Sequence, residues 1–174
     1  MSLVLGVDPG SRKTGFAVLD ASAAKPVYVA SGLIRIPSEL SLPERLAYIY
    51  DNMLLVIDKY RPTHCAIEDV FMANNARSAL KLGQARGAAI VAASCRGLAI
   101  SEYEARKVKQ SVVGTGAADK TQVQHMVTSL LKLSAVPQED AADALAVALC
   151  HINSERTLAQ LKPGLRFRRG RISL

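Results

Sequence analysis

Residues 138–151 read QEDAADALAVALCH, a run of alanine, leucine and valine that predicts a buried helix. Two aspartates, Asp140 and Asp143, stand three positions apart within it. Side chains three apart share one face of a helix, so both carboxylates point toward whatever the helix packs on. Two like charges on the inner side of an apolar helix are costly, so we looked in the rest of the sequence for groups that would explain them.

The order of the other predicted elements indicates an α/β domain. Short apolar or β-branched runs predict five strands, at 2–8, 14–20, 26–36, 63–69 and 98–104. Helical spacing of apolar or small residues predicts helices after residue 41, at 78–97, 105–113 and 119–133, and after residue 137. Three consecutive strands followed by alternating helices and strands are typical of a mixed sheet flanked by helices.

Two helix starts carry capping signals. Ser41 is followed by Glu44, and Asp119 by Gln122, the spacing at which each side chain can bond the other's backbone N–H. After the first of these signals an apolar stripe indicates an amphipathic helix. The stripe consists of Leu46, Ile49, Tyr50, Met53, Leu54 and Ile57.

Composition excludes several classes of protein. The chain has 174 residues, 49% of them hydrophobic, which suits one globular domain. No apolar run approaches the ~18 residues of a membrane span, and the first residues lack the features of a signal peptide. Cys65, Cys95 and Cys150 are scattered among apolar neighbours, so we expect buried, reduced thiols and a cytoplasmic protein.

The net charge of +7 is unevenly distributed. Residues 71–138 hold nine basic and three acidic residues, whereas residues 139–155 hold four acids and no base. From residue 156 onward there are six basic residues and no acid. A basic middle beside acidic segments suits a site that holds a polyanion while its carboxylates hold metal. We expect a folded domain over 1–155 and a basic, flexible C-terminal tail over 156–174.

Two further acids belong with the aspartate pair. Asp8 and Glu68 each end a predicted strand, where ligand sites of α/β sheets lie. If the last helix packs near both, Asp140 and Asp143 complete a ring of four carboxylates. Such a ring needs a cation, and Mg²⁺ or Mn²⁺ suits all-oxygen ligands. Two ions about 4 Å apart catalyse phosphodiester hydrolysis.

Each acid also has an ordinary explanation. Asp8, before Pro-Gly, could simply form a turn, and Glu68 could be a charge in water at a strand end. Asp140 could stabilise the start of its helix through the helix dipole. That explanation fits Asp143 less well, because Asp143 lies a turn further in. The combination of the four acids, and not the spacing of any two, therefore carries the hypothesis.

Four longer blocks resemble the RuvC family of Holliday junction resolvases. The blocks are GVDPGSRKTGFAV, AIEDVFMANNARSALKLGQARG, VKQSVVGTGAADKTQVQHMV and EDAADALAVAL, in that order, and the similarity spans residues 3–152. The resemblance implies a ribonuclease H-like fold and a homodimer that works with a branch-migration complex of the RuvA and RuvB type. It also implies Mg²⁺-dependent, symmetric nicking of two opposing strands of a four-way DNA junction, leaving ligatable 5′-phosphate ends, in homologous recombination and DNA repair.

The resemblance assigns roles to individual residues. The family's metal-binding acids fall on Asp8, Glu68, Asp140 and Asp143. Phe71 matches an aromatic that acts on the junction's bases, although core packing is the alternative. Lys109 and Lys120 match lysines near the DNA and the active site, and the resemblance implies a catalytic role for Lys120. A solvated charge on a helix is the alternative, and it fits Lys109 better than Lys120.

Other residues are less clearly placed by the sequence. Arg77, Lys81 and Arg86 lie at helical spacings and could follow a phosphate track or simply be solvated. Glu104 puts an acid where the family pattern leads us to expect a small or neutral residue. This acid makes DNA contacts by the neighbouring basic residues less certain.

Three other functions fit parts of the pattern. VDPGSRKTG is similar to the phosphate-binding hairpin of actin-like ATPases and sugar kinases, but those enzymes need a second lobe and a longer chain. A non-catalytic junction-binding protein has no need of four carboxylates near a DNA phosphate. A related nuclease for RNA or other branched DNA stays open, because selectivity for branches lies in the geometry of the dimer.

Overall fold

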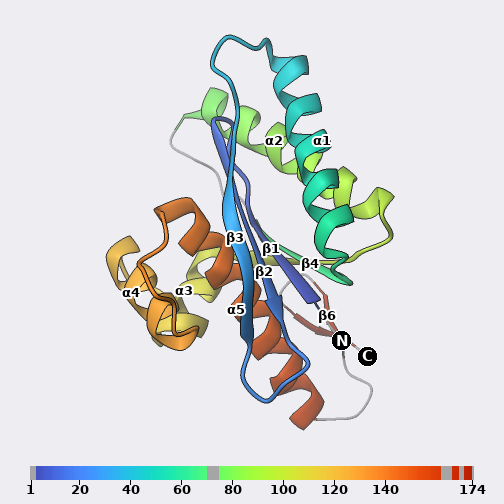
Figure 1. The fold of residues 1–174 in the computed structure, drawn as a ribbon. Coiled ribbons are helices and arrows are strands. Elements are labelled where there is room, and N and C mark those ends of the chain that lie inside the picture. Colours follow the sequence, from blue (N-terminus) through green and yellow to red (C-terminus); the bar gives the residue numbers. More distant parts are fainter. Residues whose placement is uncertain (1–2, 70–74, 162–165, 169–170, 174) are drawn as a thin grey trace.

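A five-stranded mixed sheet runs through the computed structural model, which describes residues 3–69, 75–161, 166–168 and 171–173 (Figure 1). Its strands are β1 (Leu3–Asp8), β2 (Lys13–Asp20), β3 (Val27–Arg35), β4 (His64–Asp69) and β5 (Ala99–Glu104), in the order β3-β2-β1-β4-β5. The first three strands are antiparallel, and β1, β4 and β5 are parallel. The predicted α/β class with a mixed five-stranded sheet is confirmed.

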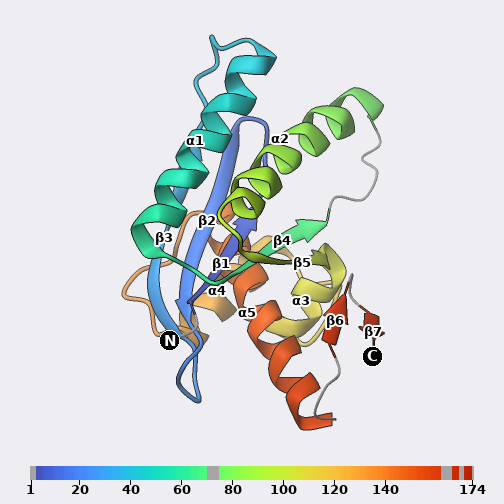
Figure 2. The ribbon, with the colours of Figure 1, turned by 90° about the vertical axis from the view of Figure 1, so that its right-hand side faces the viewer.

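Helices cover both faces of the sheet (Figures 1 and 2). They are α1 (Leu42–Tyr60), α2 (Ala76–Cys95), α3 (Ala105–Val113), α4 (Lys120–Leu130) and α5 (Glu139–Leu161). One apolar core joins α1 and α2 to the sheet, and a second core joins α3, α4 and α5 to the opposite face. This arrangement is the ribonuclease H-like fold that the resemblance implied. Among the described residues, no helix is long and apolar enough to cross a membrane.

Both predicted helix starts form as expected. A carboxylate oxygen of Glu44 accepts a hydrogen bond from the backbone N of Ser41 at 2.7 Å. At α4, Oδ1 of Asp119 accepts from the N of Gln122 at 2.8 Å, and Oε1 of Gln122 accepts from the N of Asp119 at 2.9 Å. The sequence therefore specifies locally where these two helices begin.

Helix α5 lies unusually close to strands β1 and β2. A Cβ atom added at Gly6 would come within 2.1 Å of the carbonyl oxygen of Ala144, and one at Gly15 within 2.0 Å of that of Asp140. Such separations are far inside van der Waals contact, so only glycine permits this approach. The two glycines thus fix how near the first turns of α5 come to the strands.

Side-chain hydrogen bonds hold the segment that leads into α5. Nη2 of Arg35, at the end of β3, donates to Oε1 of Gln138 at 3.0 Å. Nε2 of Gln124, on α4, donates to the carbonyl oxygen of Pro137 at 3.1 Å. The start of α5 is therefore anchored to the sheet on one side and to α4 on the other.

Some details differ from the sequence predictions. Helix α2 begins at Ala76, two residues early, because the side chain of Asn75 caps it. The expected burial of all three cysteines is wrong for Cys95, which is exposed, whereas Cys65 and Cys150 are buried. Cys95 is the last residue of α2, and only one stripe of that helix faces the core. This stripe consists of Ala85, Ala89, Ala92 and Ala93.

The end of the chain contains structure that the sequence did not predict. Helix α5 continues to Leu161, past the expected boundary at residue 155, and Leu158 is buried. The guanidinium of Arg156 donates to the carbonyl oxygens of Ala23 and Ala24 at 2.6 and 2.8 Å. Beyond it, β6 (Arg166–Arg168) and β7 (Arg171–Ser173) pair as a two-stranded antiparallel sheet.

Replacing Gly15 by alanine should push the start of α5 away from the sheet. We expect a loss of about 1–3 kcal/mol in the free energy of unfolding, as for other overpacked sites. Chemical denaturation checks this, with Gly83→Ala as control, because a Cβ at Gly83 meets no atom within 4 Å. The control should gain about 0.5–1 kcal/mol from helix propensity alone. Equal effects of the two substitutions would contradict the close-packing argument.

Candidate active site

Two carboxylates lie side by side at the carboxyl ends of neighbouring strands. Strands β1 and β4 are parallel and Val7 pairs with Ile67, so the next residues along each strand, Asp8 and Glu68, are neighbours at the same edge. Parallel strands that end together form the usual ligand-binding edge of an α/β sheet. The strand-end hypothesis for both acids is thus consistent with the register.

The hairpin that follows Asp8 is held by a buried threonine. The hydroxyl of Thr14 donates to the carbonyl oxygen of Gly10 at 3.1 Å and accepts from its N at 3.4 Å. Thr14 is fully buried, and Asp8 pairs with Gly15 across the hairpin. These hydrogen bonds therefore join the turn after Asp8 to β2, the strand that α5 contacts at Gly15.

Helix α5 brings the other two acids to the same place. The carbonyl of Asp140 rests against Gly15, which is the β-sheet partner of Asp8. Asp143 lies one turn further along the helix and shares a pocket with Asp8 and Glu68. The four carboxylates, Asp8, Glu68, Asp140 and Asp143, are called the acidic site from here on.

Two lysines complete the walls of this pocket, which has a volume of about 250 Å³. Lys109 comes from α3 and Lys120 from the first turn of α4. A second hollow of about 530 Å³ also has Asp8 and Glu68 in its wall. Carboxylates and ammonium groups from five elements of the fold therefore meet at one surface.

Three of the four acids have raised pKa values, so their ionised forms are disfavoured in this site. Burial, and then the nearby charges of Glu68, Asp143 and Asp140, raise the pKa of Asp8 to about 8. Burial and Asp143 raise the pKa of Glu68 to about 7. Burial also raises the pKa of Asp143, against the effect of Lys120. Each ionised acid costs free energy here, and a nearby cation would remove that cost.

Lys120 remains positively charged in this environment. A hydrogen bond to the carboxylate of Glu139 raises the pKa of Lys120, and the charges of Asp143 and Asp8 add to the effect. The positive charge of Lys120 in turn offsets part of the rise in the pKa values of Asp8 and Glu68. The lysine is thus a permanent cation beside the acids, suited to a phosphate oxygen.

The donor set fits a hard divalent cation. All four acids offer oxygen, which Mg²⁺ and Mn²⁺ prefer, and burial together with neighbouring carboxylates raises the pKa of Asp8, Glu68 and Asp143. Within the ranges that the structure describes, no three metal-binding side chains form a closed cluster. The ring of four carboxylates therefore stays a prediction.

The remaining predicted residues lie apart from the pocket. Arg77 and Lys81 are exposed on the first half of α2, and Lys81 lines a different pocket beside Ser11. The prediction for Phe71 lies outside the described residues. The fold thus brings the acids together with Lys109 and Lys120, and leaves Arg77 and Lys81 as outer positions on the same molecule.

Several charged residues at the site were not predicted from the sequence. Glu139 pairs with Lys120, and both Glu104 and Arg106 line the larger hollow with Asp8. Arg86, which the sequence grouped with a phosphate track, instead contacts the strand ends near Glu68. No local signal marks these contacts, because every partner is distant along the chain.

Comparisons with known proteins place the chain in a family. Residues 4–151 match the model of the family described as "Crossover junction endodeoxyribonuclease RuvC". A protein of that name from Saccharophagus degradans is 62% identical over 172 residues, 99% of each chain.

Solved structures give the same result. Thermus thermophilus RuvC is 32% identical with a TM-score of 0.81, covering 89% of this chain and 96% of the other. The structure titled "T. thermophilus RuvC in complex with Holliday junction substrate" is 33% identical with a TM-score of 0.84, covering 90% and 96%.

The raised pKa of Asp8 predicts how stability depends on pH. The unfolded acid ionises near 3.8 and the folded one near 8, so metal-free protein loses stability as pH rises between these values. Asp8→Asn avoids this loss. Relative to wild type it should gain up to about 1.4 kcal/mol per pH unit over that range. Denaturation in EDTA at pH 4 to 8 measures this, and a variant less stable than wild type at pH 8 would contradict it.

Proposed function

The chain belongs to the RuvC family of crossover junction endodeoxyribonucleases, and we propose that it cuts four-way DNA junctions at the acidic site. Family membership makes it a hydrolase that resolves Holliday junctions in recombination and DNA repair. Family membership therefore argues against an ATPase, a non-catalytic binding protein, and a nuclease for RNA or other branched DNA. The observation that supports the acidic site is one pocket lined by Asp8, Glu68, Asp143 and two lysines, with Asp140 near enough for its charge to raise the pKa of Asp8.

The acids of the site hold divalent cations. We assign Asp8, Glu68, Asp140 and Asp143 as ligands of two Mg²⁺ ions, for which Mn²⁺ substitutes. Bound there, such ions would activate a water and stabilise the leaving oxygen in phosphodiester hydrolysis. The raised pKa values of Asp8 and Glu68 support this role, since cation binding releases the cost of ionising both acids together.

The lysines act on the DNA phosphate. Lys120 is charged and stands beside Asp143 and Asp8, so it can donate to a phosphate oxygen and offset charge that develops during cleavage. The ion pair with Glu139 orients the ammonium group of Lys120. Glu139 also competes with the DNA phosphate for this ammonium group. Lys109 lines the same pocket and is suited to bind a phosphate of the DNA backbone. We therefore assign Lys120 as catalytic and Lys109 as a binding residue.

Symmetric cutting requires two such sites. A two-fold homodimer presents two equivalent pockets to a junction that has the same symmetry, so that opposing strands are nicked in register. The paired nicks carry 5′-phosphates that a ligase can seal. A branch-migration complex of the RuvA and RuvB type delivers the junction, and the reaction takes place in the cytoplasm.

Other residues extend the DNA-binding surface. Arg77 and Lys81 are exposed on α2, the helix that follows the segment containing Phe71, and suit contacts with phosphate. We assign Phe71 to stacking on an unpaired base, at roughly 1–3 kcal/mol per base. The nuclease domain was expected over 1–155, but α5 continues to Leu161 and Arg156 is bonded to Ala23 and Ala24. We infer that the basic residues after α5 add sequence-independent affinity for DNA.

Neutral replacements in the acidic site should separate cutting from binding. Asp8→Asn, Glu68→Gln, Asp140→Asn and Asp143→Asn each keep the shape of the side chain but remove a cation ligand. We expect cleavage of a synthetic immobile four-way junction to fall by about 10³-fold or more, as when catalytic groups are removed. Junction affinity should change little. Gel-based cleavage and binding assays with Mg²⁺ and with EDTA measure both quantities.

A linear duplex of equal length is the control substrate. Paired, ligatable nicks in the junction alone, with Mg²⁺ alone and with wild type alone, are the expected outcome. Loss of binding to the same degree as cutting would remove that acid from the cation site. Equal cutting of the duplex would keep the acidic site but reject selectivity for junctions.

The outer basic residues should affect affinity through salt. Arg77→Gln and Lys81→Gln each remove one phosphate contact, so the slope of log affinity against log salt should fall by roughly 0.9 for each. Lys25→Gln makes the same charge change in the β2–β3 connection, which starts opposite Leu3, at the other end of the sheet. Titrations of the junction at several salt concentrations should leave the slope of this control unchanged. A slope unaltered in all three variants would exclude α2 from the DNA surface.

A further inference from the structure

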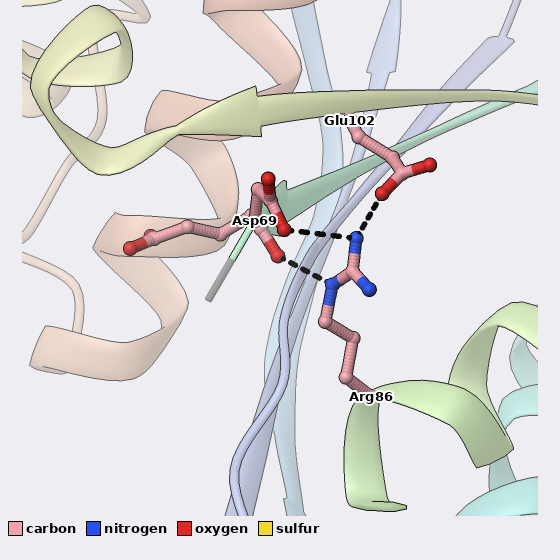
Figure 3. Close-up of polar contacts among 4 residues, drawn as sticks. Asp69, Arg86 and Glu102 are labelled. Carbon is pink, nitrogen blue, oxygen red and sulfur yellow. Dashed lines mark hydrogen bonds and ion pairs between the residues drawn. The ribbon is translucent and has the colours of Figure 1, made fainter. Parts of the chain in front are cut away.

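Arg86 reaches from α2 to the ends of two strands (Figure 3). Its Nε donates to the carbonyl oxygen of Glu68 at 3.1 Å. Its Nη2 contacts the carboxylate of Glu102 and lies 3.4 Å from Oδ1 of Asp69. The side chain is only 17% exposed. One guanidinium therefore bridges β4 and β5 at the residues that border the acidic site.

These contacts lie on the opposite side of β4 from the acidic site. Ala66 packs in the core under α3 to α5, whereas Ile67 packs in the core under α1 and α2. Side chains alternate along a strand, so Glu68 faces the α5 side and Asp69 the α2 side. Arg86 thus binds β4 on the α2 side, while the carboxylate of Glu68 lies on the α5 side, in the pocket with Asp143.

Strand β5 is held in the same way. Glu102 pairs with Ile67 in the β4–β5 ladder, and its neighbour Tyr103 is buried in the core on the α5 side. Glu102 therefore faces α2, as its bond to Arg86 requires. A rotation or slip of β4 that moved Glu68 would break the contacts of Arg86 with Glu68 and Asp69, while Glu102 holds the guanidinium on β5.

We propose that Arg86 is a positioning residue for cleavage: it fixes the peptide unit of Glu68 and so holds that carboxylate where the cation ligands converge. The proposal rests on the assignment of Glu68 to the acidic site. It replaces the phosphate-track role, because the side chain is mostly buried and its Nε and Nη2 already contact three protein oxygens. Partners of this kind around metal ligands are worth about 10- to 100-fold in metal affinity or activity.

The planar fork of arginine is what the geometry requires. Lysine keeps the positive charge between Asp69 and Glu102 but has a single nitrogen, which cannot reach two strands with the same directions. Arg86→Lys therefore keeps the electrostatic balance and removes the alignment. Full removal of the charge would leave two carboxylates close together and endanger the fold.

Three measurements on full-length Arg86→Lys test the proposal. The single-turnover rate on the junction should fall about 10- to 100-fold, and the half-saturating Mg²⁺ concentration should rise. Calorimetric titration with Mn²⁺ alone, without DNA, should show weaker binding. The dissociation constant for the junction in EDTA should change by less than about twofold, because no phosphate contact is lost.

Arg96→Lys is the matched control. Nε and Nη2 of Arg96 bind the carboxylate of Asp58 at 2.7 and 2.9 Å, joining the end of α2 to α1 with the same fork chemistry. This variant should lose stability to thermal unfolding while its Mn²⁺ affinity and Mg²⁺ requirement stay at wild-type values. A purely structural role of Arg86 would give the same pattern in both variants and would overturn the proposal.

Other outcomes are equally decisive. If Arg86→Lys loses junction affinity as much as rate, with a smaller salt slope, Arg86 is a phosphate contact. If it does not fold, Glu102→Gln takes its place, and a wild-type Mn²⁺ affinity there overturns the proposal. An Asp143→Asn variant that still cuts would contradict the acidic site itself. If Asp143→Asn does not cut the junction but Arg86→Lys has the cleavage rate and Mn²⁺ affinity of wild type, only the positioning role of Arg86 is contradicted.

Discussion

Helix α5 lies so close to the sheet that strands β1 and β2 have no side chain beneath it at Gly6 and Gly15. This contact sets the position of the first turns of the helix, where Asp140 and Asp143 stand. Because Gly15 is also the β-sheet partner of Asp8, the same contact places helix and strand acids together. A single packing constraint therefore converts two distant sequence segments into one site.

The site is built from charges that the fold keeps near each other at a cost. Burial and mutual repulsion raise the pKa of Asp8 and Glu68 to about 8 and 7, while Lys120 partly offsets the repulsion. Cation binding is the physical means of recovering that cost. On the far side of β4, Arg86 contacts two more carboxylates, and its positive charge offsets part of their negative charge. Catalytic potential and local instability have the same origin.

Short-range features of the sequence were sufficient for much of the fold. The capping pairs Ser41–Glu44 and Asp119–Gln122 form because both partners lie within one turn. The strand ending at Asp8 follows from an apolar run and a Pro-Gly turn, which are local signals. Exposure of Cys95 was missed because its apolar neighbours lie on other faces of α2. Apolar neighbours in sequence predict burial only when they share a face.

The sequence by itself determined the α/β class, the helix and strand order, and the four acids as candidates. It did so because periodicity, caps and residue type act over a few positions. Only the tertiary structure decided that Lys120 pairs with Glu139, that Arg86 binds behind Glu68, and that α5 rests on glycine. Those contacts join residues 18 to 138 positions apart. They depend on the direction of side chains in space, which the spacing of neighbouring residues in the sequence does not specify.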